Sequence, residues 1–259
     1  MIQFLDAATM PRQPLRMILY GETRAGKTFA SASAPRPLFL SAGLEGGDKT
    51  LRSFSGVKVC PIFSSAEMLE AIDRIAKEPS SCDTVVVDSI TFYADMYIAE
   101  LVQKNRGPMR LQDWGLLENH IGKMLLPRLH KLPQHVIWIA LEQTEKDESN
   151  GAVGRVGPMI QGKLARKLPA VTDMIARQAR MPLKCQDGVV REMPVWQVAP
   201  QMTPQGPILA GGRFGNVFPE GWIMPTWAAL IERIGSYIDT RQTAGTAQHT
   251  QAPPANGGA

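Results

Sequence analysis

An eight-residue segment near the N-terminus has the composition of a phosphate-binding loop. Residues 21–28 read GETRAGKT and match the pattern G-x-x-x-x-G-K-[ST]. Glycines in such a loop let successive backbone N–H groups face phosphate oxygens, and a helix that begins there adds its dipole. Lys27 is placed to balance the charge of the β- and γ-phosphates, and Thr28 offers a hydroxyl ligand to Mg²⁺. We expect ATP to be bound by Gly21, Glu22, Thr23, Arg24, Ala25, Gly26, Lys27 and Thr28, and Mg²⁺ to be bound by Thr28 among them.

A second chemical group follows an apolar run further along the chain. Residues 84–91 read TVVVDSIT, so a β-branched segment typical of a buried strand ends at Asp88. In an open α/β sheet, the carboxyl ends of the strands form the ligand-binding edge. Asp88 can hold Mg²⁺ there, through a water molecule. The alternative role for this carboxylate is to cap the helix that follows.

Hydrolysis would also need a base for the attacking water. Ser89, and not a second acid, follows Asp88, so the base must come from elsewhere. The glycine-rich segment 41–48, SAGLEGGD, follows the second predicted strand and offers Glu45 at the same sheet edge. We assign Glu45 as the water-activating base, with Asp48 as a substitute. A solvated loop glutamate is the alternative.

A polar side chain is expected at the end of a later strand. Residues 141–147 read LEQTEKD, and Gln143 lies where the strand is expected to leave the sheet. Its amide is suited to sense the γ-phosphate and to couple nucleotide state to the next loop. The alternative is an ordinary polar residue that terminates a strand.

The elements that position these residues alternate along the first two thirds of the chain. A phosphate-loop pattern rarely occurs by chance between a strand and a helix. In this sequence a strand is expected before residues 21–28 and a helix after them, so the context supports the motif. Uninterrupted apolar strands between helical patterns are typical of a parallel sheet covered on both faces, so the sequence predicts an α/β fold. The predicted strands are 15–20, 37–41, 84–87 and 136–141, and the predicted helices are 27–34, one that begins at the capping box of Ser64 and Glu67, 90–103, and 112–131 with an interruption at Pro127.

The composition and the hydrophobic pattern of the sequence change after about residue 181. Prolines and glycines become frequent, alternation over 189–198 predicts antiparallel strands, and 225–238 reads as a last amphipathic helix. From Gln242 onward there is no charged residue and no aliphatic side chain larger than alanine, so we expect a disordered tail. The predicted organisation is a lead-in over 1–14, a core over 15–180, an extension packed on the core over 181–240, and a tail over 241–259.

Composition narrows the classes of protein that remain. The 259 residues are 44% hydrophobic and 20% charged, with a formal net charge of +4. This is typical of a globular protein and permits an anionic partner. No apolar run approaches the roughly 18 residues of a membrane-spanning helix, and the first residues do not read as a signal peptide. The three cysteines form no CxxC pair, which argues against a zinc site and a disulfide framework and for the cytoplasm.

The order of these features resembles the RecA-type recombinase ATPase core. GETRAGKT, a glutamate after the second strand, VVVDS without a following acid, and a glutamine on a later strand occur in that order. The similarity covers about residues 15–180. It is greatest to short bacteriophage recombinases and single-strand annealing ATPases, the AAA-type nucleotide-binding proteins of phages. The resemblance implies a RecA-like P-loop fold with a mainly parallel central sheet, helices on both faces and a small β-rich C-terminal extension.

The resemblance also implies roles for individual residues. It implies that Lys27, Thr28 and Asp88 hold nucleotide and Mg²⁺, that Glu45 is the catalytic base and that Gln143 is the γ-phosphate switch. Subunits of this family assemble into rings or filaments, and a neighbour's cation can complete the site. In this chain the segment ILAGGRFGN, 208–216, leaves Arg213 as the candidate for such a trans-acting cation.

Two groups of basic residues lie beside the loops that the family turns toward DNA. Counterion release favours binding of phosphates by such cations, and the poor aromatic content predicts backbone binding with little base reading. The alternative is a solvated helix face or a subunit interface. The acids Glu145, Asp147 and Glu148 count against tight binding at the second loop. The residues expected to bind single-stranded DNA are Lys104, Arg106, Arg110, Lys163, Arg166 and Lys167.

The resulting hypothesis is a Mg²⁺-dependent, DNA-stimulated ATPase for phage-type recombination or annealing, in the cytoplasm of a bacterial host cell. The expected partners are single-stranded DNA, further copies of the chain and a single-strand-binding protein, with no membrane. A P-loop loader or motor ATPase that acts on a protein partner in replication or packaging is the main alternative. A small-molecule kinase and a non-hydrolysing binding module remain as further alternatives.

Overall fold

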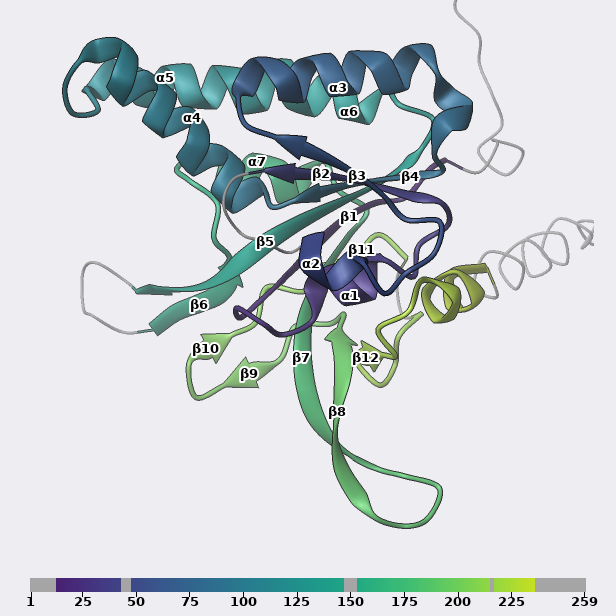
Figure 1. The fold of residues 1–259 in the computed structure, drawn as a ribbon. Coiled ribbons are helices and arrows are strands. Elements are labelled where there is room, and N and C mark those ends of the chain that lie inside the picture. The colour runs from purple at the N-terminus through teal and green to yellow at the C-terminus, as the bar shows by residue number, and fades with distance from the viewer. Residues whose placement is uncertain (1–12, 43–47, 147–152, 215–216, 236–259) are drawn as a thin grey trace, which may run out of the picture.

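A mainly parallel sheet forms the centre of the molecule (Figure 1). The computed structural model describes residues 13–42, 48–146, 153–214 and 217–235. Within them, hydrogen bonds connect the strands in the order β12-β8-β7-β1-β5-β4-β2-β3, with β11 beside β7 and β6 beside β5. The strands are β1 (Arg16–Gly21), β2 (Pro37–Ala42), β3 (Lys58–Ile62), β4 (Thr84–Asp88), β5 (His135–Lys146), β6 (Val153–Pro158), β7 (Met174–Lys184), β8 (Val190–Gln197), β11 (Gly211–Gly212) and β12 (Trp222–Ile223), and β9 (Met202–Thr203) and β10 (Gly206–Pro207) form a separate hairpin.

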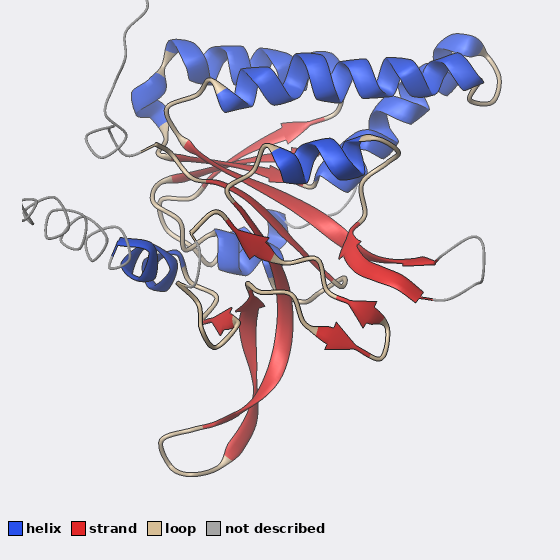
Figure 2. Cartoon of the chain, turned by 180° about the vertical axis from the view of Figure 1, so that it is seen from behind, coloured by secondary structure: helices blue, strands red, loops and turns tan. Residues whose placement is uncertain are grey.

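Helices cover both faces of this sheet (Figures 1 and 2). One face carries α3 to α7, and the other carries α1, α2 and a final helix over 227–235. The mainly parallel sheet and its two helical layers confirm the predicted RecA-like α/β fold. The helices are α1 (Lys27–Ser31), α2 (Asp48–Leu51), α3 (Ser65–Lys77), α4 (Ile90–Asn105), α5 (Leu111–Asn119), α6 (Leu126–His130) and α7 (Leu164–Ala170), with a 3₁₀ turn over Pro79–Ser81 and a π-helical segment over His120–Leu125.

The uninterrupted apolar run of β5 is explained by two separate cores. Val136, Trp138 and Ala140 belong to the core beneath α3 to α7, whereas Ile137 and Ile139 belong to the core beneath α1 and the final helix. Successive side chains of a strand point to opposite faces, so a strand buried on both faces has no polar alternation. β5 therefore lies at the centre of the sheet, between β1 and β4.

Some predicted elements differ from those of the structure. The helix predicted over 112–131 consists of α5, the π-helical segment and α6, so the interruption begins before Pro127. β3 was not predicted, because this edge strand is largely exposed and contains Pro61. Proline is tolerated at a sheet edge, where its missing N–H has no partner to lose.

The extension that we predicted to pack on the core after residue 180 begins within a strand of the central sheet. β7 runs without interruption from Met174 to Lys184, so the boundary falls inside this strand. β7 and β8 pair antiparallel and project from the body as an arm, at the bottom of Figure 1. Within the described residues, no helix has both the length and the apolar character needed to cross a bilayer.

Candidate nucleotide-binding site

The loop between β1 and α1 curls as a phosphate-binding loop should. Gly26 precedes α1 with a φ of 95°, in the left-handed region that glycine enters at little cost. A lack of room for a side chain is not the reason for glycine at this position, since an added Cβ would meet nothing within 4 Å. At the other end of the loop, a Cβ on Gly21 would lie 2.6 Å from the backbone oxygen of Gln178 on β7. The first glycine therefore serves close strand packing, and the second serves the turn into the helix.

Lys27 lies inside the loop that would cradle the phosphates. Its side chain is buried, and Nζ donates hydrogen bonds to the backbone oxygens of Gly21 (3.0 Å) and Glu22 (2.8 Å). The ammonium group is thus held against the first two residues of the loop, while Thr23 and Arg24 further along it are exposed. This is the position from which a cation can reach the β- and γ-phosphates of a bound triphosphate.

Thr28 and Asp88 meet at the carboxyl edge of the sheet. Thr28 Oγ1 donates to Asp88 Oδ2 over 2.9 Å, and the Asp88 carboxylate is almost fully buried. Ser89 caps α4, because its side chain accepts a hydrogen bond from the Phe92 N–H. Helix capping, the alternative role for Asp88, is therefore performed by its neighbour.

This pair of oxygen donors fits Mg²⁺. Among the described residues, no group of three or more His, Cys, Asp or Glu side chains could hold a metal ion by itself. Mg²⁺ usually binds one or two protein oxygens, several waters and the substrate phosphates, so Thr28 and Asp88 are a sufficient protein contribution. When bound, the ion would supply charge neutralisation of the β- and γ-phosphates.

Gln143 does not lie at the end of a strand. β5 continues to Lys146 and pairs antiparallel with β6, so Gln143 is an interior residue of β5. It does lie beyond the last residue of β5 that pairs with β1, which is Leu141 opposite Gly21. Its Nε2 donates to the backbone oxygen of Pro158 over 3.3 Å. The side chain is thereby directed toward β6, and the sensor role remains a prediction.

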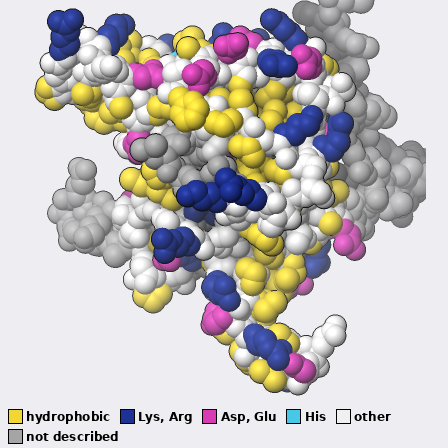
Figure 3. Space-filling view, viewed as in Figure 1, with side chains coloured by type: hydrophobic (Ala, Val, Ile, Leu, Met, Phe, Trp, Pro, Cys, Tyr) yellow, Lys and Arg dark blue, Asp and Glu magenta, His cyan; other side chains and the backbone are white. Residues whose placement is uncertain are grey.

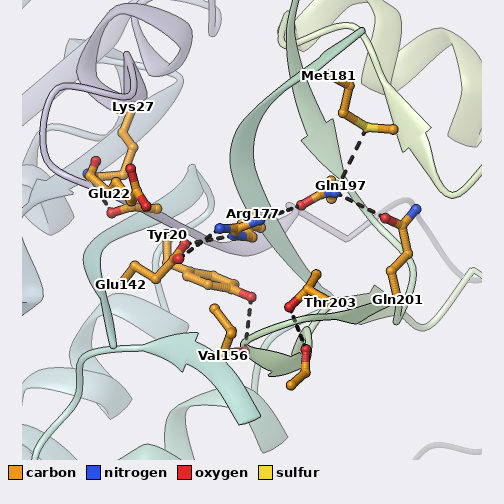
Figure 4. Close-up of polar contacts among 12 residues, drawn as sticks. Tyr20, Glu22, Lys27, Glu142, Val156, Arg177, Met181, Gln197, Gln201 and Thr203 are labelled. Carbon is orange, nitrogen blue, oxygen red and sulfur yellow. Dashed lines mark hydrogen bonds and ion pairs between the residues drawn. The ribbon is translucent and has the colours of Figure 1, made fainter. Parts of the chain in front are cut away.

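A pair of charged residues that the sequence did not predict lies beside the loop (Figure 4). Arg177 on β7 and Glu142 on β5 form a two-pronged ion pair across β1, with distances of 2.7 and 2.8 Å, while Arg177 Nη1 donates to Gln197 on β8. Arg177 is in register with Tyr20, the residue before the loop begins. The hydrogen bonds with Glu142 raise the pKa of Arg177. No local signal reveals such a pair, because its members are 35 residues apart.

The proposed base lies outside the part of the chain that the structure describes. Glu45 falls in the gap between residues 42 and 48, and the side chain of its substitute Asp48 is likewise not described. Both assignments stay predictions.

The trans-acting candidate Arg213 lies near the N-terminal end of β1, whereas the phosphate loop follows its C-terminal end. It follows β11, where Gly212 pairs with Met174, and Met174 also pairs with Met17. The phosphate loop begins at the other end of β1, after Gly21. Arg213 is therefore remote from the nucleotide site of its own chain, and a role at a neighbour's site remains a prediction.

The six predicted DNA-binding residues lie near the two ends of α5. Lys104, Arg106 and Arg110 surround the turn between α4 and α5, where Figure 3 shows basic side chains at the corner of the molecule. Lys163, the N-cap of α7, and Lys167 within α7 both form ion pairs with Glu118 of α5. The structure thus brings two segments that are distant in sequence to one helix.

The geometry agrees with a comparison of the sequence with protein families. A family model described as AAA domain (AAA_24) matches residues 13–197, which is more than half of the chain. The chain belongs to this family of AAA-type P-loop ATPases. The match ends with β8, so the AAA domain includes the β7–β8 arm. This membership supports nucleotide binding at the loop of residues 21–28.

Other comparisons add little to this assignment. No curated protein matches the AAA domain described here. Among solved structures, it is similar to a prototypical ATPase from the type III secretion system of pathogenic bacteria, with 14% sequence identity and a TM-score of 0.42. The match covers 64% of this chain and 52% of that ATPase chain, so the chain spans about half of its length. A similarity of this degree carries no information about function.

Proposed function

We propose that this AAA domain is a Mg²⁺-dependent ATPase of the RecA type that acts on single-stranded DNA in phage-type recombination or annealing. The observation that carries the ATPase part is the 2.9 Å hydrogen bond between Thr28 and Asp88. It places the hydroxyl of the phosphate loop and the carboxylate of a buried strand at one point, where an ion can contact both through oxygen. Lys27 lies beside the same loop.

In this proposal, catalysis depends on positioning and on charge. Lys27 balances the phosphate charge, Glu45 activates the attacking water and Gln143 reports the γ-phosphate to the following strand. Arg213 is remote from the nucleotide site of its own chain. It could therefore complete only the site of a neighbouring subunit, which requires an assembly. A ring or a filament is therefore the proposed active form.

The DNA part of the proposal rests on the basic residues at the two ends of α5. Cations on an exposed surface attract nucleic acid through counterion release, without regard to base sequence. Lys104, Arg106 and Arg166 are exposed, so they are accessible to phosphates.

The test is ATP turnover with and without single-stranded DNA, in the wild type and in Lys27→Ala. We expect turnover that DNA stimulates and that Lys27→Ala abolishes. Lys77→Ala, at the exposed C-terminal end of α3 on the other face of the sheet, removes the same charge outside the site and serves as the control. If calorimetry detects no binding of a nucleoside triphosphate to the folded wild type, the proposal is wrong.

A loader or motor ATPase with a protein partner is the second candidate. The observation that favours it is the projecting β7–β8 arm, whose tip carries the exposed Val189 and Val190. Exposed apolar side chains on a projecting element suit a protein contact. ATP turnover that Lys27→Ala abolishes but that DNA does not change would favour this candidate, and transfer of phosphate to a small molecule would favour a kinase.

A further inference from the structure

One face of α5 carries apolar side chains that the rest of the molecule does not cover. Leu111, Trp114 and Glu118 are at positions i, i+3 and i+7 of the helix, so they lie along one stripe. Leu111 is 92% exposed and Trp114 is 44% exposed, whereas Asp113 and Leu117 are buried on the inner side.

Cations lie at the N-terminal end of this stripe. Arg110 is the N-cap of α5, and its backbone N–H and side chain both bond to the carboxylate of Asp113. Asn105 donates to the same carboxylate, which fixes the turn from α4 into α5. Lys104 and Arg106 in this turn are exposed. At this end of α5 the carboxylate of Asp113 is therefore buried, while the side chains of Lys104 and Arg106 lie at the surface.

A second set of cations surrounds Glu118 at the C-terminal end. Lys167 forms a hydrogen-bonded ion pair with Glu118, and Lys163 Nζ lies 3.8 Å from the other carboxylate oxygen. The bond with Lys167, followed by the charges of Lys163 and Lys123, lowers the pKa of Glu118, so its carboxylate stays ionised at neutral pH. Arg166, on the same turn of α7, is exposed.

α7 is held closely against this end of the helix. A Cβ on Gly122, in the π-helical segment after α5, would lie 3.3 Å from the side chain of Leu164. Lys163 and Lys167 are thus fixed beside α5, although Lys167 is 49 residues from Glu118 in the sequence. Arg110 and Glu118 are eight residues apart, which is about 12 Å along a helix at 1.5 Å per residue.

We propose that the exposed stripe of α5 is a binding site for single-stranded nucleic acid, in which a base stacks on Trp114 and the cations at both helix ends hold the flanking phosphates. Glu118 restrains Lys163 and Lys167 and so limits affinity until a phosphate displaces it. The proposal rests on the proposed action on single-stranded DNA and adds the surface, the stacking residue and the restraint. An aromatic platform between basic groups is the combination by which single strands are bound without base preference.

A protein partner would be favoured if the stripe were apolar at both ends. Instead, the apolar residues Leu111 and Trp114 are bounded by positive charge on both sides. A duplex would not suit the site, because its stacked bases cannot reach a side chain on a convex helix. The charge pattern and the isolated ring therefore select an unpaired strand.

Tryptophan fluorescence tests the proposal directly. All five tryptophans lie in the described residues, and Trp138, Trp196 and Trp227 are buried, while Trp222 is half-buried. Titration of the full chain with a short oligothymidylate should quench the emission of Trp114. Trp222→Phe should retain this quenching and Trp114→Phe should lose it, although Trp114→Phe keeps a ring and should bind nearly as well. Trp114→Ala should weaken binding measured by anisotropy about tenfold, within the range observed for stacked bases.

If Glu118 restrains the two lysines, its replacement should change the affinity for DNA in the opposite direction to Trp114→Ala. Glu118→Gln should strengthen binding, because two lysines are released to phosphates. It should also steepen the fall of log affinity with log salt by roughly 0.7 for each further phosphate that a released lysine neutralises. Lys49→Gln, a charge change on the other face of the sheet, should alter neither quantity.

The outcomes separate this proposal from the proposed function. If the oligonucleotide binds and stimulates ATP turnover but Trp114→Ala binds like the wild type, the stripe is not the site and the function stands. If Glu118→Gln weakens binding, the restraint is wrong. If no oligonucleotide binds, both proposals fail. If Trp114→Ala instead lowers the mass of an assembly seen by light scattering and leaves DNA affinity unchanged, the stripe is a subunit interface and the proposal is overturned.

Discussion

The ion pair between Arg177 and Glu142 should stabilise the domain at the point where the phosphate loop begins. Both side chains are largely buried, with exposed fractions of 20% and 11%. Replacement of Arg177 by methionine would leave a largely buried carboxylate without its two charged hydrogen bonds. Hydrogen bonds to charged groups contribute about 1.5–3 kcal/mol each, and broken buried pairs cost about 3–5 kcal/mol. Because some solvent reaches the pair, we expect Arg177→Met to lower the unfolding free energy by about 3 kcal/mol.

The double variant distinguishes the pair from its separate residues. Replacing both residues, as Glu142→Leu with Arg177→Met, removes both charges, so we expect it to be only about 1 kcal/mol less stable than the wild type. With a similar cost of about 3 kcal/mol for Glu142→Leu alone, these values give a coupling energy of about 5 kcal/mol in a double-mutant cycle. The measurement is urea unfolding of the wild type, both single variants and the double variant.

A matched control exists on the surface. Arg36 and Asp83 form a two-pronged pair with both distances at 2.7 Å, but their exposed fractions are 58% and 47%. Exposed pairs contribute at most about 1 kcal/mol, so the same cycle should give a much smaller coupling energy here. Equal coupling energies in the two cycles would refute the argument, since burial is the difference between the pairs.

Three further predictions follow from single residues. Gly21→Ala should lower the unfolding free energy by about 1–3 kcal/mol, because its Cβ would meet the backbone of Gln178 at 2.6 Å, whereas a shift below about 0.5 kcal/mol in urea unfolding would count against this close packing. Glu45→Gln should bind ATP in calorimetry but lose turnover, and unchanged turnover would remove Glu45 from its role. Burial lowers the pKa of His120, which is hydrogen-bonded to Tyr93, so protonation favours the unfolded state and stability should fall as the pH drops below about 6.5. His120→Gln should make that fall shallower in urea titrations at several pH values, and an identical pH dependence would contradict the assignment.

Elements whose signals are local were predictable from the sequence. The loop GETRAGKT, the strand ending at Asp88 and the capping box at Ser64 each depend on residues within a few positions of one another. The structure shows the Ser64 side chain accepting from the Glu67 N–H, and Glu67 accepting from the Phe63 N–H, so the helix begins where the pattern indicated. Asp88 likewise lies at the end of a buried strand. In these cases backbone chemistry over one turn determines the outcome.

Features that depend on strand order were not predictable. Glu142 contacts Arg177 only because β1 lies between β5 and β7, and neither charge is unusual in its own segment. Gln143 was expected at a strand end, but antiparallel pairing with β6 extends β5 by several residues. The association of Glu118 with Lys167 also arises from tertiary packing. A sequence pattern reports which residues share a face of one element, and it does not report which faces meet.

Thr91 provides a physical connection between the nucleotide site and the stripe on α5. Its hydroxyl donates to the backbone oxygen of Met159 over 2.9 Å and accepts from the Leu141 N–H over 3.0 Å. Thr91 is three residues after Asp88, in the first turn of α4, and Met159 is four residues before Lys163. One helical turn, one hydrogen bond and a short chain segment therefore join Asp88, the proposed Mg²⁺ ligand, to the lysines that Glu118 holds. Because this route is short, the proposed nucleotide binding and the proposed strand binding can influence each other without any large rearrangement of the sheet.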